Sequence, residues 1–438
     1  MRLEQELKRK IEARQAHIGI VGLGYVGLPL AVEFAKAGFR VTGVDVDREK
    51  VRTLRAGRSH IEDVPSTEVA PLVKQRLLRA QDHYRGSGEF DVVVICVPTP
   101  LRKTKDPDIS YIVSAMDELV REVRKGQLMI LESTTYPGTT EEVLRPRIEE
   151  RGLEIGRDFF LAFSPERVDP GNRQFKTHNT PKVVGGSTPA CTDVAVCLYR
   201  QAIQTVHPVS STRVAEMVKL LENTFRAVNI ALVNEIALMC ERLQLDVWEV
   251  IDGAATKPFG FMRFYPGPGI GGHCIPLDPH YLSWKLKTLD YSARFIELAS
   301  EINGSMPLVV VRRASELLNR KRKSVNGARI LVIGVSYKRD TRDLRESPAL
   351  DIMRLLDQRG AKLSYHDPYN DTVRIGEGKS YRSSKPSAAN LSKADLVLIV
   401  TDHSSIDYDE IVRHAPLVLD TRNSTARVRH KPSKVHKL

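Results

Sequence analysis

The sequence predicts an α/β protein with two Rossmann-like, doubly wound domains joined by a long central helix and a helical domain. Three observations support this fold: a glycine-rich turn between a strand-like run and a helical run near residue 22, a stretch over residues 212–245 with neither Gly nor Pro, and a second series of strand-like runs in the last third. With 438 residues the chain is too long for one ordinary hydrophobic core, so two or three domains are expected.

The first domain begins with a strand–turn–helix–strand pattern over residues 17–47. An apolar run precedes the glycines, helical spacing follows through Leu30, Phe34 and Ala37, and a β-branched run closes the unit. Further on, FDVVVICVPTP and QLMILESTTYPG are continuous apolar runs that stop at Pro or Gly. Such runs are typical of parallel strands buried on both faces, so this domain is predicted to be doubly wound.

The glycine turn has the form G-x-G-x-x-G, with Gly22, Gly24 and Gly27. Glycines at these places let the backbone approach a pyrophosphate at the N-terminus of the following helix. Asp45 ends the second strand about 20 residues later, where a carboxylate accepts hydrogen bonds from ribose hydroxyls. It also repels a 2′-phosphate, which favours NAD over NADP, although Arg48 close by keeps NADP as an alternative.

The middle of the chain is predicted to be helical. Apolar residues recur at helical spacing from Thr212 to Leu245: Val214, Met217, Leu221, Phe225, Val228, Leu232, Ile236 and Met239. Because this helix is apolar on more than one face, we expect a helix-to-helix dimer interface. A second helical stretch, residues 291–303, follows the glycine-rich segment YPGPGIGGHC and is expected to pack beside the first.

The last third repeats the first in outline. GARILVIGVSY, AKLSYHDPY, KADLVLIVTDH and PLVLDTRN are strand-like runs that correspond to those of the first domain. At the first turn this copy has Gly334-Val335-Ser336-Tyr337-Lys338 in place of the three-glycine motif. We therefore expect it to bind something other than a dinucleotide pyrophosphate held in the usual way.

One of the five scattered cysteines lies in a glycine-rich turn. Cys274 stands within GIGGHCIPLD, four residues before Asp278. Glycines allow close approach of a substrate, and a thiolate that attacks an aldehyde gives a thiohemiacetal from which a second hydride can leave. The alternatives are a buried, inert cysteine and a zinc site through His273, Cys274, Asp278 and His280, whose spacing fits no usual ligand pattern.

Lys219 and Asn223 are four residues apart within the predicted central helix. They therefore share one face and can reach one site together. The alternative is a snorkelling or paired surface lysine with no role in chemistry.

The net charge is +12, and part of it lies in the C-terminal segment 426–438. We interpret this segment as a solvated basic tail, with a nucleic-acid-binding arm as the alternative; other basic residues favour a substrate that carries phosphates. The N-terminal segment 1–15 is charged and helix-like, and shows no secretory signal, so a cytosolic location is expected. No apolar run approaches the roughly 20 residues that span a bilayer, so no membrane association is expected.

Taken together, these motifs resemble the UDP-glucose/GDP-mannose dehydrogenase superfamily over nearly the full chain. The glycine fingerprint, EST-T-YPG, SPERVDPGN, the K-x-x-x-N helix motif, GIGGHCIPLDP and SYKRDTRDLRESP occur in the family's order. Within the family, the chain most resembles the UDP-N-acetylglucosamine 6-dehydrogenase branch. The resemblance implies an NAD-binding domain over 16–208, a central helical dimerisation domain over 209–305 and a Rossmann-like domain over 306–425 that binds the UDP-sugar.

The resemblance also implies roles for individual residues. Cys274 is the nucleophile that forms a thioester, and Asp278 positions water or takes part in proton transfer. Lys219 and Asn223 stabilise the oxyanion or alkoxide. Thr134 and Glu166 hold a catalytic water and assist general acid and base steps. The implied NAD site adds Tyr25, Val26, Pro98, Thr99 and Thr134. The implied substrate site comprises Glu166, Arg167, Lys219, Asn223, Arg263, Gly271, Lys338 and Arg345.

The substrate is expected to be UDP-N-acetylglucosamine, oxidised at C6 with two equivalents of NAD. Ile275 and Leu277 replace an aromatic residue and a lysine of the UDP-glucose branch, and Arg167 replaces another aromatic residue, which favours a 2-acetamido sugar. UDP-N-acetylmannosamine and UDP-glucose are the nearest alternatives. From other classes, a non-catalytic NAD-binding protein and a nucleic-acid-binding protein are disfavoured, because neither needs Cys274 with its polar neighbours.

Overall fold

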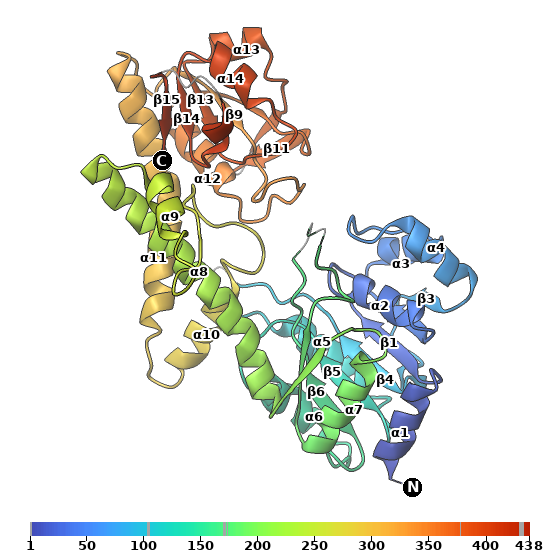
Figure 1. Ribbon diagram of the computed structural model, residues 1–438. Coiled ribbons are helices and arrows are strands. Elements are labelled where there is room, and N and C mark those ends of the chain that lie inside the picture. Colours follow the sequence, from blue (N-terminus) through green and yellow to red (C-terminus); the bar gives the residue numbers. More distant parts are fainter. Residues whose placement is uncertain (1, 103–105, 170–171, 173, 377, 429–432) are drawn as a thin grey trace. The chain divides into compact units, whose positions relative to one another are not determined.

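The computed structural model describes residues 2–102, 106–169, 172, 174–376, 378–428 and 433–438 (Figure 1). Tertiary contacts divide the chain into two compact units. The first comprises Met1–Glu222 with His280–Tyr291, and the second comprises Asn223–Pro279 with Ser292–Leu438. Each unit is built around its own sheet of mainly parallel strands, as the sequence predicts.

Within the described part of the first unit, the strands form one sheet in the order β3-β2-β1-β4-β5-β6-β7-β8. Strands β6 and β7 pair antiparallel and the other neighbours pair parallel. The strand order reverses between β1 and β4, which is where doubly wound sheets bind ligands. The bounds are β1 His17–Val21, β2 Arg40–Val44, β3 Leu78–Gln81, β4 Val92–Ile95, β5 Leu128–Leu131, β6 Phe160–Phe163, β7 Lys182–Gly186 and β8 Val206–Val209.

The central strands of this sheet are buried along their whole length because helices cover the sheet. The helices are α1 Leu3–Glu12, α2 Gly27–Lys36, α3 Arg48–Arg55, α4 Ser66–Lys74, α5 Ser110–Leu119, α6 Arg145–Glu149 and α7 Pro189–Tyr199, with short turns at Ser87–Glu89 and Thr140–Leu144. The charged segment at the N-terminus is helical, as expected. Its helix α1 packs on α7 and buries Leu7 and Ile11.

The predicted long helix is present as α8, Thr212–Leu243. It is followed by α9 Val247–Ala254, α10 Asp278–Lys287 and α11 Arg294–Arg320. The prediction for the second helix was too short, because α11 continues past Gly304 and Pro307. An internal proline lacks a backbone donor and costs about 3 kcal/mol. Burial of apolar residues beyond it, among them Val310 and Leu317, offsets that cost.

The predicted packing of the second helix beside the first is confirmed by a pair of buried amides. Asn234 of α8 donates through Nδ2 to Asn303 Oδ1 of α11 at 2.9 Å, and Asn303 Nδ2 donates to the carbonyl of Ala227 at 3.0 Å. Asn234 Oδ1 in turn accepts from the backbone N–H of Gly267 at 2.9 Å. The two helices and the start of the glycine-rich segment are therefore joined by one chain of hydrogen bonds.

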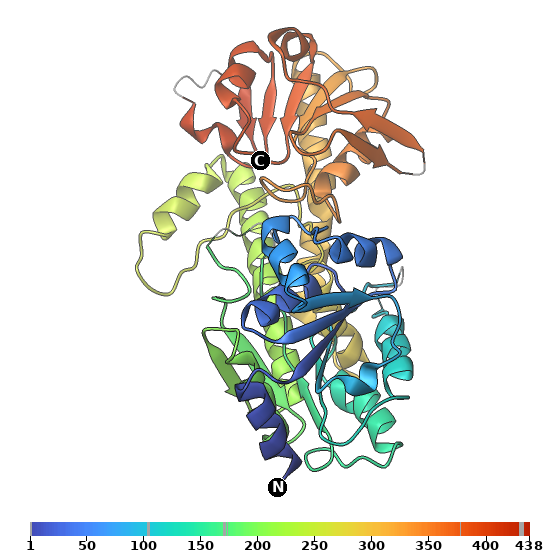
Figure 2. The same cartoon turned by 90° about the vertical axis from the view of Figure 1, so that its right-hand side faces the viewer.

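In the described residues of the second unit, five strands form a parallel sheet in the order β10-β9-β13-β14-β15. Figure 2 shows these strands, in orange and red, with helices on both faces of the sheet. The unit buries two separate apolar clusters. The bounds are β9 Arg329–Ile333, β10 Lys362–His366, β13 Leu396–Ile399, β14 Val418–Asp420, β15 Val435–Lys437, α12 Pro348–Gln358, α13 Ala388–Lys393, α14 Tyr408–His414 and a short turn at Ser424–Arg427, with a hairpin of β11 Thr372–Ile375 and β12 Lys379–Arg382.

The interpretation of residues 426–438 as a solvated tail is wrong at its end. Val435–Lys437 forms strand β15, which pairs parallel with β14. Lys437 also lies 2.5 Å from Asp246 Oδ2. Backbone pairing with an edge strand and an ion pair hold this segment, whereas its composition alone resembles a tail. Among the residues that the structure describes, no helix combines the length and the apolar character needed to cross a bilayer.

Candidate active site

The glycine turn follows β1 directly, and its three glycines have different surroundings. Gly22 has φ +91°, and a Cβ there would lie 2.5 Å from the carbonyl oxygen of Cys96. A Cβ on Gly27 would lie 1.8 Å from the carbonyl oxygen of Gly22. A Cβ on Gly24, in contrast, would meet no atom of the described residues within 4 Å. Gly22 and Gly27 are thus required by the turn itself, and Gly24 leaves the backbone open to a ligand such as a pyrophosphate.

The structure brings Asp45 to this turn. Its side chain is buried, and Oδ2 accepts a hydrogen bond from the backbone N–H of Leu23 at 2.8 Å. Oδ1 accepts from Asp47 N–H at 2.9 Å, and the ammonium of Lys50 lies 3.5 Å from Oδ2. A carboxylate fixed beside the glycines fits the binding of an adenosine ribose, so the chain's own residues fit NAD.

Four further residues of the expected NAD site lie on two loops of the same unit. Tyr25 is exposed and Val26 half-buried, just before α2 begins. Pro98 is exposed and Thr99 is buried after β4, where the Thr99 carbonyl accepts a hydrogen bond from the Tyr281 hydroxyl. Both loops follow central strands of the sheet at the edge where the strand order reverses.

Thr134 and Glu166 follow the neighbouring parallel strands β5 and β6, each three residues after the strand ends. Both are half-buried. The carboxylate of Glu166 accepts hydrogen bonds from the backbone N–H groups of Arg167 and Val168, both at 2.6 Å. The topology therefore places Thr134 and Glu166 at one edge of the sheet.

A buried charged cluster that was not predicted from the sequence lies next to Glu166. Lys182 Nζ lies 2.8 Å from Glu132 Oε2 and 3.8 Å from Glu166 Oε2, and the Tyr199 hydroxyl donates to Glu132. Burial lowers the pKa of Lys182, but the two carboxylates outweigh it and raise that pKa. Glu132 and Lys182 are 50 residues apart, so no local sequence pattern predicts that they pair.

The side chain of Arg167, which is expected to contact the substrate, forms an ion pair and a hydrogen bond within the first unit. Its Nη2 lies 2.6 Å from Glu222 Oε1, and Nη1 donates to the Pro181 carbonyl at 2.7 Å.

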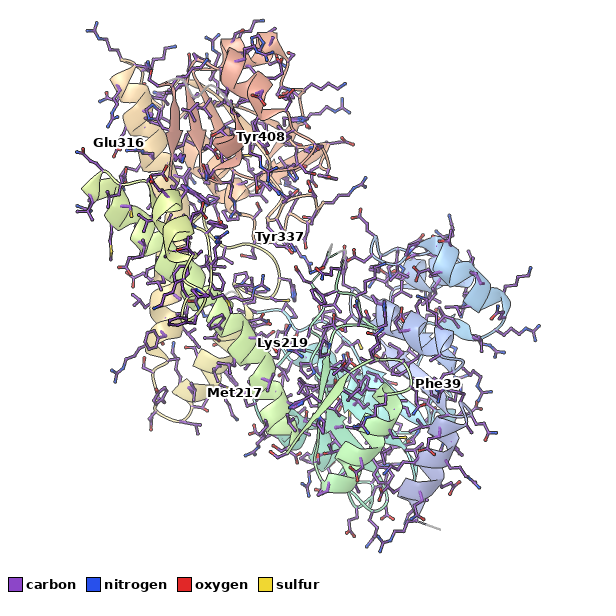
Figure 3. All side chains as sticks on the ribbon, viewed as in Figure 1. Phe39, Met217, Lys219, Glu316, Tyr337 and Tyr408 are labelled. Atoms are coloured by element: carbon purple, nitrogen blue, oxygen red, sulfur yellow. The ribbon has the colours of Figure 1, made fainter. Side chains whose placement is uncertain are left out.

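Lys219 and Asn223 lie one turn apart on α8, where Figure 3 labels Lys219. Both side chains are buried. Lys219 is 8% exposed, so the alternative of a snorkelling or paired lysine at the surface is wrong as to its position. Asn223 Nδ2 donates to Asp278 Oδ2 at 2.5 Å. The structure therefore joins the helix motif to the acid that begins α10.

Cys274 is exposed, whereas Cys96, Cys191 and Cys240 are buried. The interpretation of Cys274 as a buried, inert cysteine is therefore wrong. Its carbonyl accepts from the N–H of Asp278 at 2.8 Å, which closes a turn at the start of α10. Burial raises the pKa of the Cys96 thiol well above its usual value, so that thiol is a poor nucleophile.

The loop before Cys274 packs against the C-terminal part of the second unit. A Cβ on Gly271 would lie 2.6 Å from the Cβ of Tyr337 and 2.7 Å from the carbonyl oxygen of Glu346. The N–H of Gly272 donates to the carbonyl of Arg345 at 2.9 Å. Figure 3 labels Tyr337 on this segment. The structure thus joins the cysteine loop to the segment that carries Lys338 and Arg345.

The remaining expected substrate residues are placed as follows. Lys338 is half-buried, and Arg345 is exposed with Nη2 2.6 Å from Asp343 Oδ2. Arg263 is exposed in the segment after α9, with Nε 3.8 Å from Asp252 Oδ1.

Three regions of the chain match the UDP-glucose/GDP-mannose dehydrogenase family. Residues 16–203 match its NAD binding domain, 213–305 its central domain and 331–427 its UDP binding domain. The structure resembles that of a UDP-D-ManNAc dehydrogenase from Pyrococcus horikoshii with a TM-score of 0.86 and 33% identity, over 96% of this chain and 98% of the other.

Two relatives are similar to the chain over most of their length. A UDP-N-acetyl-D-glucosamine 6-dehydrogenase from Pseudomonas aeruginosa is 37% identical over 80% of this chain and 82% of its own. A UDP-N-acetyl-D-mannosamine dehydrogenase from Pyrococcus horikoshii is 36% identical over 93% of this chain and 95% of its own. The chain therefore belongs to the UDP-glucose/GDP-mannose dehydrogenase family, and it is an NAD-dependent UDP-sugar dehydrogenase.

Proposed function

We propose that this enzyme oxidises the C6 hydroxyl of UDP-N-acetylglucosamine to the carboxylate in two steps. The observation that carries the proposal is the exposed thiol of Cys274, in a glycine loop packed against the segment of Lys338 and Arg345. A non-catalytic NAD-binding protein has no use for this arrangement. NAD, when bound, accepts one hydride in each oxidation.

Cys274 explains why the reaction continues past the aldehyde. Loss of a hydride and a proton from C6 gives an aldehyde, and the sulfur attacks its carbonyl carbon to form a thiohemiacetal. Loss of a second hydride and proton gives a thioester. Water adds to the thioester carbonyl, the C–S bond breaks, and the thiol leaves with a proton while the uronate is released. Two hydrides are lost and one water is consumed for each product.

The other residues stabilise charge and move protons. We assign Lys219 and Asn223 to the oxygen at C6, where negative charge develops; removal of one such donor costs about 3 to 4 kcal/mol of transition-state stabilisation in comparable sites. We assign Thr134 and Glu166 to a water molecule and to general acid and base steps. Asp278 is assigned to fixing the amide of Asn223, to which it is bonded, and to proton transfer.

Arg263, Arg167 and Lys338 are assigned to the substrate only by resemblance. Arg345 is assigned by resemblance and by its backbone hydrogen bond to Gly272 of the cysteine loop, in which Gly271 also lies. The choice of sugar follows from Ile275 and Leu277, which differ from the UDP-glucose branch. UDP-N-acetylmannosamine is the second candidate, because a dehydrogenase for that sugar is 36% identical over a larger share of the chain. Because NAD and UDP-sugars are multiply charged and do not cross bilayers unaided, we place the enzyme in the cytosol.

We also propose that the enzyme forms a homodimer through α8. Large apolar side chains remain exposed along this helix: Val214, Met217, Leu221, Phe225, Leu232, Met239 and Leu243. Figure 3 labels Met217 on this helix. A monomer seldom exposes such a continuous apolar stripe, and a second copy of the same helix would cover it. Light scattering after gel filtration should give a dimer, and Leu221→Glu should give a monomer while Tyr111→Glu on α5 should not.

The decisive experiment for the substrate measures NADH formed and product mass with UDP-N-acetylglucosamine, UDP-N-acetylmannosamine and UDP-glucose. We expect two NADH per UDP-N-acetylglucosaminuronate, with no accumulation of free aldehyde, and a lower kcat/KM for the other two sugars. One NADH per product would refute the two-step oxidation. A higher kcat/KM for another sugar would instead refute the choice of substrate.

A further inference from the structure

The first turns of the two sheets are built on the same hydrogen bonds. In the first sheet, Gly22 N–H donates to the Val44 carbonyl, and Leu23 N–H donates to Asp45 Oδ2, both at 2.8 Å. In the second, Gly334 N–H donates to the His366 carbonyl, and Val335 N–H donates to Asp367 Oδ2, both at 2.8 Å. Asp367 therefore occupies in the second sheet the position that Asp45 occupies in the first.

The two carboxylates differ in how many donors they already hold. Asp45 accepts from two backbone N–H groups and lies near one ammonium. Asp367 is 2% exposed. The donors to Asp367 are the N–H groups of Val335, Ser336, Tyr369 and Asn370, the Asn370 amide and His403 Nε2. A carboxylate offers about four lone-pair sites, so Asp367 has no capacity left for a ribose hydroxyl.

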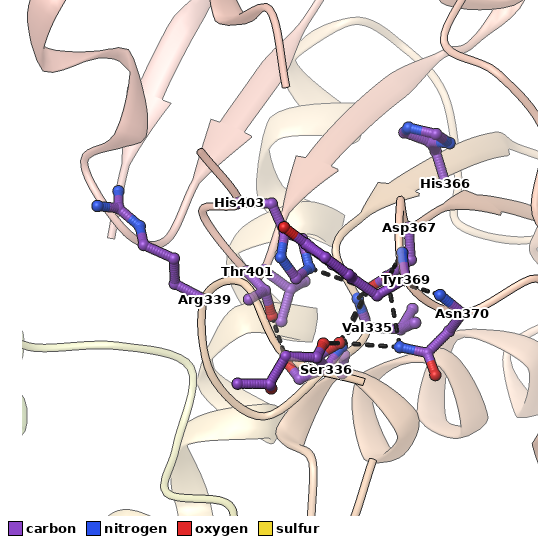
Figure 4. A network of polar contacts seen from close by, with 12 residues as sticks. Val335, Ser336, Arg339, His366, Asp367, Tyr369, Asn370, Thr401 and His403 are labelled. Carbon is purple, nitrogen blue, oxygen red and sulfur yellow. Dashed lines mark hydrogen bonds and ion pairs between the residues drawn. The ribbon is translucent and has the colours of Figure 1, made fainter. Parts of the chain in front are cut away.

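His403 completes this network, and its surroundings determine its tautomer. Figure 4 labels His403 among the residues of this network, and the residue is 0% exposed. The backbone N–H of Asp340 donates to Nδ1 at 3.0 Å, so Nδ1 must carry the lone pair. The proton is then on Nε2, which donates to Asp367 Oδ2 at 3.0 Å. Burial raises the pKa of Asp367, but the hydrogen bonds from His403 and Val335 outweigh it and hold that pKa well below its usual range.

The imidazole thereby connects the strand end to the loop over residues 336–341. Asp340 has φ +57°, a backbone conformation rare outside glycine, and its Oδ1 also accepts from Ser404 N–H at 2.8 Å. The other side of the loop is held through Ser336, whose hydroxyl donates to the Thr341 carbonyl and whose carbonyl accepts from Thr401 Oγ1, both at 2.6 Å (Figure 4). The loop carries Lys338 at its centre.

We propose that His403 is a positioning residue for the UDP-sugar site, because it fixes the loop that presents Lys338. This inference rests on the proposed binding of the nucleotide sugar by the second unit. In the first unit, Asp45 keeps acceptor sites that a ribose can use. In the second unit, Asp367 uses its acceptor sites, together with His403, to hold the loop. This geometry explains why the turn after β9 lacks the second and third glycines of the motif. Its loop is held by hydrogen bonds within the protein and does not have to leave the backbone open to a pyrophosphate.

Three variants of His403 separate its two contacts. In His403→Asn the side-chain oxygen can replace Nδ1 as the acceptor for Asp340 N–H, and in His403→Gln the side-chain amide can replace Nε2 as the donor to Asp367. His403→Ala removes both. His414→Gln, on the surface helix α14 of the same domain, is the matched control.

For His403→Ala we expect the Kd for UDP and the KM for the UDP-sugar to rise about tenfold, with kcat within about threefold and the KM for NAD unchanged. Amide hydrogen exchange over residues 336–345 should be faster than in the unmodified enzyme. His403→Asn should slow that exchange again, whereas His403→Gln should resemble His403→Ala. The control should match the unmodified enzyme in every measurement.

Hydrogen exchange needs no ligand, so it distinguishes the inference from the proposed function. Unchanged exchange in His403→Ala, or wild-type exchange in His403→Gln, would refute the role of the Asp340 contact. Faster exchange with an unchanged Kd for UDP would refute a role in ligand binding. If the unmodified enzyme bound no UDP, the proposed function would fail, and the inference with it, whatever the exchange rates. If His403→Ala does not fold, His403→Asn and His403→Gln provide the same comparison.

Discussion

Asn223 and Asp278 share a hydrogen bond of 2.5 Å between Nδ2 and Oδ2, and both side chains are buried. The bond connects α8, which carries Lys219, to Asp278, which lies four residues after Cys274. It also fixes the orientation of the Asn223 amide, because Nδ2 must face the carboxylate. The arrangement predicts that the two residues act as a coupled pair.

A double-mutant cycle tests this coupling. Asn223→Ala leaves a buried carboxylate without this donor, and Asp278→Ala leaves a buried amide without this acceptor, so each should lower the free energy of unfolding by about 1 to 3 kcal/mol. The double variant should cost less than the sum of the two. Denaturant unfolding of all four proteins measures the coupling, and additive losses would contradict it.

Cys274→Ala should abolish formation of the carboxylate while leaving the binding of NAD and UDP-sugar nearly intact, because the thiol acts on the aldehyde and does not hold the ligands. Product analysis by mass and equilibrium binding measure the two effects. Cys197→Ala, a half-buried cysteine in the first unit, is the control. Full activity in Cys274→Ala would exclude a covalent intermediate.

Lys219→Ala should lower kcat by about two orders of magnitude or more, with a smaller effect on the KM for the UDP-sugar, because its charge is needed where negative charge develops in the transition state. Steady-state kinetics measure both constants, and Lys8→Ala on α1 is a surface control. If only KM changed, Lys219 would be a binding residue instead.

Asp45 should make the enzyme prefer NAD. Asp45→Ala or Asp45→Ser should lower the ratio of kcat/KM for NAD to kcat/KM for NADP, since each substitution removes the negative charge that repels a 2′-phosphate. The ratio of kcat/KM for the two cofactors is the measurement. Equal use of NAD and NADP by the unmodified enzyme would show that Asp45 does not discriminate between them.

Stability should depend on pH through Glu216, which is buried and accepts hydrogen bonds from Gly138 and Thr140. Burial raises its pKa from 4.5 to about 7. Between these values the folded protein binds a proton that the unfolded chain releases, so the stabilisation is present below pH 4.5 and is lost as the pH rises through 7.

The isosteric variant Glu216→Gln isolates this effect, because its side chain does not titrate. The difference in unfolding free energy between the unmodified enzyme and Glu216→Gln should change by up to about 3 kcal/mol from pH 4.5 to pH 7, with the unmodified enzyme losing relative stability. Urea unfolding at a series of pH values measures it. Parallel curves for the two proteins would show that the pKa of Glu216 is not raised.

Local patterns were sufficient to predict the parts of the molecule that depend on near neighbours in sequence. The glycine turn with Asp45, the helix α8 and the loop of Cys274 are such parts, because turn geometry and helical periodicity are local properties. The continuation of α11 past Pro307 was not predictable in this way, because packing of later residues compensates for the proline.

Contacts between distant residues account for the other omissions. Lys182 and Glu132 form a buried pair across 50 residues, and His403 meets Asp367 across 36. Neither pair has a local signature, and a buried charge is costly until its partner arrives from elsewhere in the fold. Strand β15 depends likewise on the exposed edge of β14.

The loop before Cys274 is fastened at both ends. Gly267 is bound to Asn234 and Gly272 to Arg345, and Gly271 between them has no room for a side chain against Tyr337. The number of residues in this stretch is therefore fixed by the distance that it must bridge. Insertions and deletions should be tolerated instead in the exposed segment 256–260, which precedes Arg263, so a search for variants with altered loop lengths should be directed there.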